Sequence, residues 1–117
     1  MRAFLALLAL LVSQAAPAQA WPTRPVRFLV PFAAGAGIND IMARLVGQHL
    51  GAGLGQPVVI ENRAGAGGIA GTEAAAKAAP DGTTFLMTNV SLVTSAYLYK
   101  LPYDPQKDFV PVTLVAT

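Results

Sequence analysis

The sequence predicts an α/β fold, with a parallel sheet that carries helices on both faces. Short apolar runs alternate with segments of helical hydrophobic spacing, in the order β-α-β-α-β-α-β. Two of the turns from strand to helix are rich in glycine, at residues 33–40 and 64–71. Because crossovers between parallel strands are right-handed, we expect these turns at one edge of the sheet, where ligands of such sheets bind.

The individual elements follow from local patterns. The expected strands are residues 26–30, 58–60, 83–87 and 109–115. The expected helices are residues 41–50, 69–79 and 92–98. Asn39 and Asp40 have N-cap chemistry for the first helix, and the glycines at 51–55 would end it. The chain stops close to the fourth apolar strand without a turn or cap, so we expect it to be cut within a larger domain.

The first 20 residues have the three parts of a secretory signal peptide. Arg2 gives a positive start, residues 3–12 are an unbroken apolar run, and Ala18-Gln19-Ala20 fits a cleavage site. The alternative is a buried N-terminal helix; the apolar run is too short to span a membrane. Removing 20 of the 117 residues leaves a mature chain of 97, residues 21–117, which we expect to be exported with no membrane-inserted segment.

Composition excludes some partners. Without Arg2 the chain has seven Lys and Arg against six Asp and Glu, with no basic cluster, which argues against binding to nucleic acid. The sequence has no cysteine, so an exported domain must be held by its core alone.

The glycine-rich turns predict an anion site. A strand that ends in glycines and enters a helix leaves free backbone N–H groups at the positive end of that helix. Two such turns side by side on a parallel sheet indicate a pocket for an anionic small molecule.

A nucleotide site is a weaker interpretation of the same turns. Gly35-Ala36-Gly37 begins a G-x-G-x-x-G pattern, and Glu61 lies where a ribose-binding acid would. Two observations oppose a nucleotide site. Asp40 stands in place of the third glycine and would put a carboxylate near a pyrophosphate. The Gly-Lys-Ser/Thr of the Walker phosphate-binding loop is also absent. We therefore expect no nucleotide or other cofactor.

Catalytic and metal sites are not predicted. His49 is the single histidine and has no partner at ligand spacing. Ser91 and Ser95 lack a G-x-S-x-G context, and no close pair of carboxylates stands out. Arg63 has two open roles, contact with an anionic ligand or a structural ion pair. Tyrosines 97, 99 and 103 are expected to pack rather than to form a stacking platform.

The same segments are similar to the tripartite tricarboxylate transporter substrate-binding proteins, also called Bug receptors. The resemblance covers residues 21–117 and rests on several motifs in the family's order. These motifs are residues 30–35, 40–45, 54–63, 65–68, 75–84, 101–105, 107–109 and 111–115.

The resemblance implies a periplasmic binding protein, type II-like, with two α/β lobes and a cleft between them. Members are about three times as long as the mature chain, so residues 21–117 would be the N-terminal part of the first lobe, with the second lobe missing. The implied ligand is a small mono-, di- or tricarboxylate, delivered to membrane permease subunits, and the implied protein is not an enzyme. Two alternatives stay open: a secreted α/β enzyme, and an exported sensor or adaptor on the same scaffold.

The resemblance also implies the binding residues. The family holds a ligand carboxylate between its first two strand–helix loops, mainly through backbone N–H groups and waters, and its third loop borders the cleft. The residues carried over are Phe32, Ala33, Gly35, Gly37, Asp40, Gly65, Ala66, Gly67, Gly68, Thr88 and Asn89. The first loop departs from the family's P-F-x-x-G-G-x-x-D pattern by one extra residue, which interrupts the glycine pair.

Overall fold

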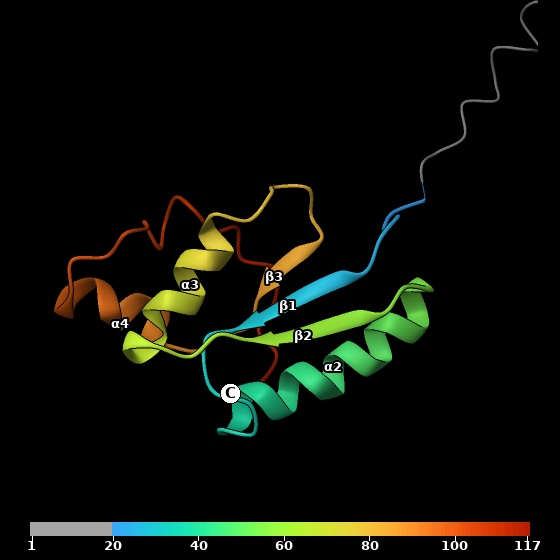
Figure 1. Cartoon of the computed structure of the whole chain (residues 1–117), viewed down its shortest axis with the longest axis horizontal. Helices are drawn as coiled ribbons and strands as arrows, with labels where there is room; N and C mark the ends of the chain where they lie inside the picture. The colour runs from blue at the N-terminus through green and yellow to red at the C-terminus, as the bar shows by residue number, and fades with distance from the viewer. Residues whose placement is uncertain (1–19) are drawn as a thin grey trace, which may run out of the picture.

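The computed structural model describes residues 20–117, so the predicted signal peptide, apart from Ala20, lies outside the described residues. Figure 1 shows the order of the elements along the chain. The strands are β1 (Val26–Val30), β2 (Val58–Asn62) and β3 (Thr84–Leu86). The helices are α2 (Ile38–Leu54), the 3-10 turn η1 (Ala66–Gly68), α3 (Ile69–Ala76) and α4 (Ser91–Leu98).

The three strands form a parallel sheet in the order β2-β1-β3. Val26 pairs with Val58 and Val30 pairs with Asn62, while Phe28 pairs with Phe85 on the other side. This register aligns the carboxyl ends of the strands at one edge, as the sequence predicted.

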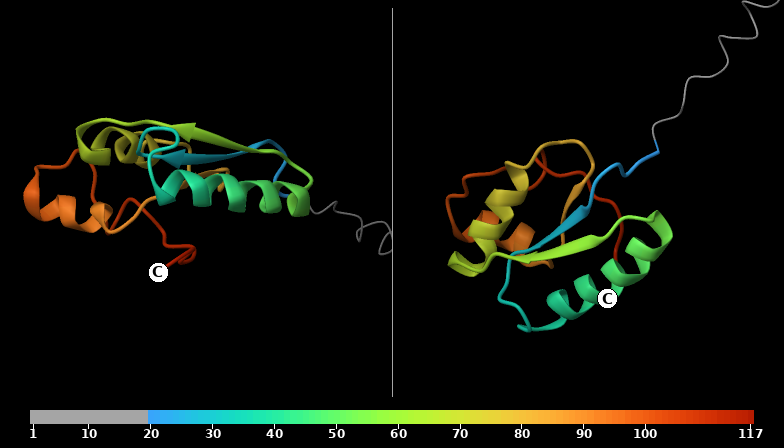
Figure 2. Two further views of the ribbon diagram at one scale, coloured as in Figure 1. Left: turned by 90° about the horizontal axis from the view of Figure 1, so that it is seen from below. Right: turned by 45° about the vertical axis from the view of Figure 1, so that its right-hand side comes forward.

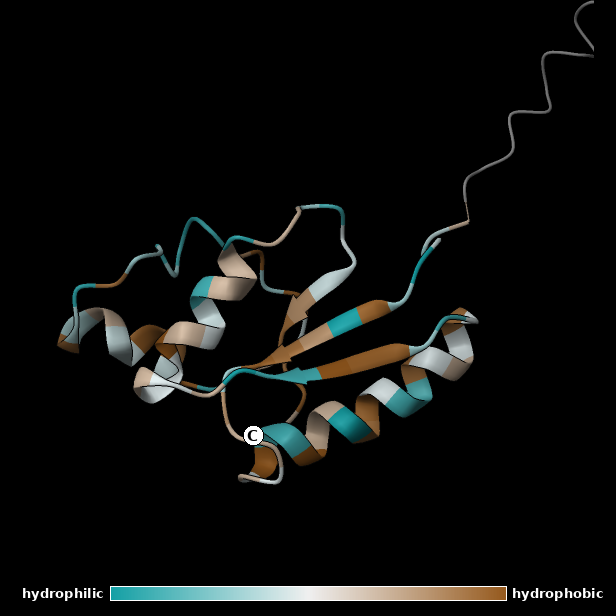
Figure 3. Cartoon of the chain, in the orientation of Figure 1, coloured by the Kyte–Doolittle hydropathy of each residue, from teal (hydrophilic) through white to brown (hydrophobic). Residues whose placement is uncertain are grey.

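The core lies between β1 and α2. Val26, Phe28 and Val30 alternate along β1 toward the same face as Ala43 of α2, and all four side chains are buried. Figure 3 shows this concentration of apolar residues along the strands. Because a central parallel strand is covered on both faces, β1 is apolar at every position except Arg27, which is half-buried.

The opposite face of the sheet is covered by α3. Leu29, which alternates with Phe28 along β1, is 1% exposed. Gly71 of α3 packs on Pro31, just beyond β1. The right-hand view of Figure 2 shows α2 and α3 flanking the strands, which confirms helices on both faces.

The predicted fourth strand is wrong for this chain. Residues 109–117 contain no strand, and Val110, Val112 and Leu114 are 87%, 72% and 77% exposed. An apolar run becomes a buried strand only where another surface covers it, and no described element lies over this run. Instead, the run borders an apolar hollow of about 1240 Å³ between α2 and β3.

Several predicted boundaries shift. Helix α2 begins at Ile38 with Gly37 as its cap, so the assignment of Asn39 and Asp40 as N-cap residues is wrong. It also continues through Gly51 to Leu54 and ends at Gly55, whose φ of 66° is left-handed. Helix α3 ends at Ala76, three residues before the predicted end. Within residues 20–117, every helix is too short or too polar to cross a bilayer.

Candidate anion-binding site

Three loops meet at the carboxyl edge of the sheet. The loop after β1 leads into α2, the loop after β2 leads into η1 and α3, and the loop after β3 leads into α4. The first residues of two loops are tied to β1, because Arg63 N donates to Val30 O at 2.9 Å and Met87 N donates to Leu29 O at 2.8 Å. All the candidate binding residues named from the sequence therefore lie on these loops or on the first turn of α2.

The second loop presents unused backbone donors. Gly65, Ala66, Gly67 and Gly68 have φ values of 144°, 47°, 66° and 96°. Gly68 N donates to Gly65 O at 3.0 Å, whereas the amides of Gly65, Ala66 and Gly67 donate to no acceptor within residues 20–117. Successive amides in a left-handed turn at a helix N-terminus form a concave cluster of donors, which suits an anion.

The first loop is held by its own hydrogen bonds. Gly35 N donates to Asp40 Oδ2 at 2.8 Å, and Gly37 N donates to Gly35 O at 3.2 Å. Gly35 and Gly37 have φ values of 74° and 85°, so they shape the loop while their amides are already used. Among the predicted residues that precede Gly35, the amides of Phe32 and Ala33 donate to no acceptor within the described part of the chain.

A side-chain network that the sequence did not reveal fixes the first loop. Asp40 is 2% exposed, and its carboxylate accepts hydrogen bonds from Arg44 Nε at 2.9 Å and from Asn62 Nδ2 at 2.8 Å. Arg44 Nη2 lies 3.2 Å from Asn62 Oδ1 and closes the triangle. Hydrogen bonds from Arg44, then from the Gly35 amide and Asn62, lower the pKa of Asp40 to about 2, so the carboxylate is charged at neutral pH.

The two glycine loops also touch each other. Asn62 Nδ2, at the end of β2, donates to Phe32 O in the first loop at 3.1 Å. A Cβ placed on Gly68 would stand 3.5 Å from the Phe32 ring. The end of the second strand thus sets the position of the first loop, and any group bound between the loops would contact both.

The third loop adds one polar group without a partner. Thr88 Oγ1 is buried and makes no hydrogen bond within residues 20–117. Asn89 Oδ1 accepts a hydrogen bond from Ser91 N at 2.9 Å, which fixes the turn just before α4. The Thr88 hydroxyl is thus a buried polar group on this loop that lacks a hydrogen-bond partner within the described residues.

Arg63 makes the structural ion pair that was one of its two predicted roles. Its Nε lies 2.5 Å from Glu61 Oε1, and Arg27 Nη2 lies 2.5 Å from Glu61 Oε2. Hydrogen bonds from Arg27 and then Arg63 lower the pKa of Glu61. Glu61 is thus ion-paired with both Arg27 and Arg63.

Outside the three loops, the sequence raised His49 and the acidic side chains as other candidates for chemistry. His49 is exposed, with Nδ1 2.9 Å from Leu45 O of its own helix. Across residues 20–117, no three His, Cys, Asp or Glu side chains come together as metal ligands.

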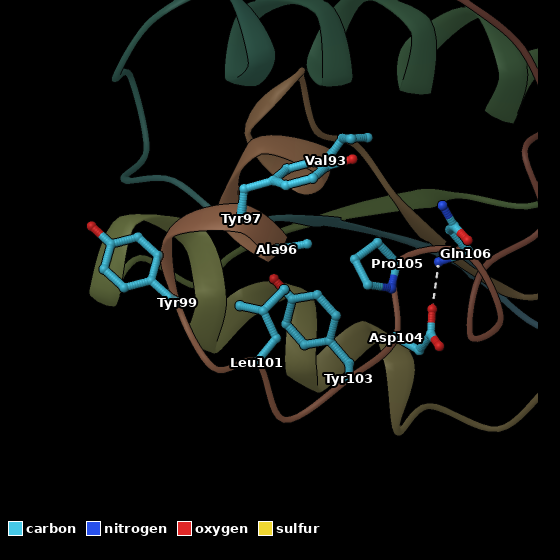
Figure 4. Close-up of a pocket in the computed structure, with 9 residues that line it drawn as sticks. All are labelled: Val93, Ala96, Tyr97, Tyr99, Leu101, Tyr103, Asp104, Pro105 and Gln106. Carbon is cyan, nitrogen blue, oxygen red and sulfur yellow. Dashed lines mark hydrogen bonds between the residues drawn. The ribbon is translucent and has the colours of Figure 1, made fainter.

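A pocket of about 390 Å³ lies beside the C-terminal end of α4 (Figure 4). It is lined by Tyr97, Tyr99 and Tyr103, and its one charged side chain is Asp104, so its lining offers a carboxylate no cationic side chain. Tyr103 is 9% exposed and packs edge-on against Phe109, as predicted. Tyr97 and Tyr99 are 85% and 59% exposed, so the prediction that they pack is wrong.

Residues 42–117 match a protein family described as "Tripartite tricarboxylate transporter family receptor". Protein BugT of Bordetella pertussis is 46% identical over 106 residues, which are 86% of this chain and 32% of BugT. The chain thus spans about a third of the length of the curated relatives it matches.

Solved structures agree with the geometry of the lobe. The periplasmic binding protein BugD superposes with a TM-score of 0.71 at 43% identity, over 76% of this chain and 30% of BugD. MatC from Rhodopseudomonas palustris, solved with bound malate, superposes with a TM-score of 0.70 at 41% identity, over 81% of this chain and 33% of MatC.

Proposed function

This chain belongs to the tripartite tricarboxylate transporter receptor family, and we propose that it is a solute-binding receptor that captures a small organic carboxylate. The observation that carries the proposal is the run of free amides at Gly65, Ala66 and Gly67. The malate bound to MatC is a small carboxylate of the class that such amides suit. The family is one of transport receptors rather than enzymes, and we extend that to this chain.

The proposed contacts follow from which donors are free. A carboxylate would accept hydrogen bonds from the second loop and from the Ala33 amide, and the Thr88 hydroxyl would add a side-chain donor. Hydrogen bonds to a charged acceptor contribute more than those between neutral groups. The N-termini of the adjoining helices would each favour the negative charge by roughly 0.3–1 kcal/mol. Gly35, Gly37, Asp40 and Asn89 would support the loops rather than touch the ligand.

We further propose that residues 21–117 are the N-terminal part of the first of two lobes. The hollow beside β3 is lined by apolar side chains that include Phe28, Phe85, Met42 and Leu50, which a longer receptor would cover with its own chain. A second lobe would close over the glycine loops and exclude water, which strengthens hydrogen bonds to the ligand. Sequencing the reading frame beyond codon 117 tests this; a stop codon there, with a stable monomer that binds ligand, would refute it.

The proposed location is the periplasm, with delivery of the ligand to permease subunits of a tripartite transporter. Cleavage after Ala20 would release the mature receptor. Mass spectrometry of the protein from the periplasmic fraction should give Trp21 as the first residue. An intact Met1 on the exported protein would contradict the assignment.

Calorimetric titration of the full-length gene product tests binding itself. The ligands would be malate, adipate and citrate, with glucose and an amino acid amide as uncharged or cationic controls. We expect saturable binding of at least one carboxylate and none of the controls. A receptor that binds a control tightly and no carboxylate would overturn the proposal.

A further inference from the structure

Asp40 puts a negative charge directly beside the first glycine loop. Its carboxylate is 3% exposed, and Oδ2 lies 2.8 Å from the Gly35 amide nitrogen. An organic anion bound at this edge would be repelled by that carboxylate, and the repulsion is stronger in a partly buried site than in water. A site for anions therefore needs a compensating positive charge at Asp40.

Arg44 supplies that charge from the next turn of α2. Its Nε lies 2.9 Å from Asp40 Oδ2, and its Nη2 lies 3.2 Å from Oδ1, so the guanidinium engages both carboxylate oxygens. Arginine keeps its proton throughout the physiological range. The pair as a whole is neutral, although each member is charged.

Asn62 locks the pair in place. Its Oδ1 accepts from Arg44 Nη2 at 3.2 Å while its Nδ2 donates to Asp40 Oδ1 at 2.8 Å. The guanidinium is thus held against both α2 and the end of β2. A long flexible side chain held at two points loses its alternative positions, so the positive charge stays next to Asp40.

We propose that Arg44 is a specificity-determining residue of the carboxylate site, the counter-ion that allows the first glycine loop to hold an anion next to Asp40. The inference rests on the proposed function. Arg44 acts on the ligand through Asp40, so its role is one of charge. Without Arg44, the Kd of an anion with two charges would rise more than the Kd of an anion with one. A merely structural role would affect ligands of either charge equally.

The experiment uses the full-length receptor and pairs of ligands that differ by one carboxylate. The pairs are malate with lactate, and adipate with hexanoate, titrated by calorimetry at low and high salt. The variants are Arg44→Gln, Arg44→Lys and the double variant Arg44→Gln with Asp40→Asn. Arg24→Gln is the matched control, because Arg24 pairs with Asp81 at the opposite, amino edge of the sheet.

We expect Arg44→Gln to raise the Kd of the dicarboxylate at least about fivefold at ~0.05 M salt and by less at ~0.5 M salt. Arg44→Lys keeps the charge but loses the bidentate geometry, so its Kd for the dicarboxylate should lie between those of wild type and Arg44→Gln. The double variant removes both charges and should recover to within about threefold. Arg24→Gln should bind as wild type.

Two results would overturn the inference. One is an Arg44→Gln variant whose Kd values for the two members of a pair are unchanged, or change by the same factor. The other is a double variant as weak as Arg44→Gln, which would indicate lost structure rather than lost charge balance. If the wild-type receptor binds none of the four acids, the proposed function itself fails and this inference falls with it; if the wild type binds and only the variants deviate from expectation, the proposed function stands.

Discussion

The side chain of Asn62 bridges the two loops of the site: its amide donates to Phe32 O at 3.1 Å and to Asp40 Oδ1 at 2.8 Å. One residue at the end of β2 therefore holds the first loop by its backbone and by its buried carboxylate. The conformation of the loop depends on this bridge as well as on its own glycines.

Replacing Asn62 with Ala should destabilise the receptor by about 1–3 kcal/mol, because Phe32 O loses its donor and Asp40 Oδ1 loses the shorter of its two hydrogen bonds. The measurement is the free energy of unfolding in urea. Gln48→Ala is the control, since the Gln48 side chain is exposed on α2 and makes no hydrogen bond within the described residues. Equal stabilities of the two variants would show that the bridge contributes nothing.

Gly71 should not tolerate a methyl group. A Cβ there would stand 2.5 Å from Arg63 O and 2.7 Å from Pro31 Cα, both backbone atoms that cannot move alone. We expect Gly71→Ala to cost at least about 2 kcal/mol in unfolding free energy. Gly53→Ala, in α2 with no atom within 4 Å of its Cβ position, should instead be neutral or stabilising by up to about 1 kcal/mol. A Gly71→Ala variant as stable as Gly53→Ala would mean that α3 does not pack this closely on β1.

The contribution of Asp40 to stability should vanish in acid. Folding lowers the pKa of Asp40 from 3.8 to about 2. The charged carboxylate therefore stabilises the folded state at pH values above the pKa that Asp40 has in the unfolded chain. That stabilisation is fully present above pH ~4 and is lost as the pH falls through ~2. The difference in unfolding free energy between wild type and Asp40→Asn should therefore be constant at neutral pH and shrink over this interval. A difference that stays constant down to pH ~2 would show that Asp40 is not held in its charged form.

Much of the fold could be predicted from the sequence, because local patterns decide it. The run Val26–Val30 is a buried central strand, and the glycines after β1 and β2 are turns with positive φ. The prediction of a fourth strand was wrong because its apolar residues form a strand only when another surface covers them, and a local sequence pattern does not show whether such a surface is present. The predicted start of α2 was wrong because Gly37 is the cap residue and the Asp40 carboxylate accepts a hydrogen bond from the Gly35 amide.

The loops of the site could be predicted, but their internal bonding could not. Arg44 and Asn62 lie 18 positions apart, and their contact depends on how α2 packs on β2. No spacing rule brings two such residues together. The i,i+4 relation of Asp40 and Arg44 was a usable signal for an ion pair on a helix. The close approach of Gly71 to Pro31 likewise depends on the position of α3 over the sheet.

A side chain at Gly67 should block the proposed ligand without disturbing the core. Gly67 has a φ of 66°, which disfavours β-branched residues, and no protein atom lies within 4 Å of its Cβ position. Val at this position would both fill that open space and distort the turn that presents the free amides. Gly53→Val adds the same side chain on α2, and His49→Gln changes the single histidine; both should bind as wild type.

The most direct measurement of the central claim is the Kd of the full-length receptor for its best carboxylate, by calorimetry, in wild type and Gly67→Val. The account predicts that Gly67→Val raises the Kd at least about tenfold, about 1.4 kcal/mol, while the stability of the unliganded receptor, followed by its melting temperature, changes less. A Gly67→Val receptor that binds the carboxylate as wild type does, or a His49→Gln receptor that no longer binds it, would contradict the assignment of the ligand to the glycine loops.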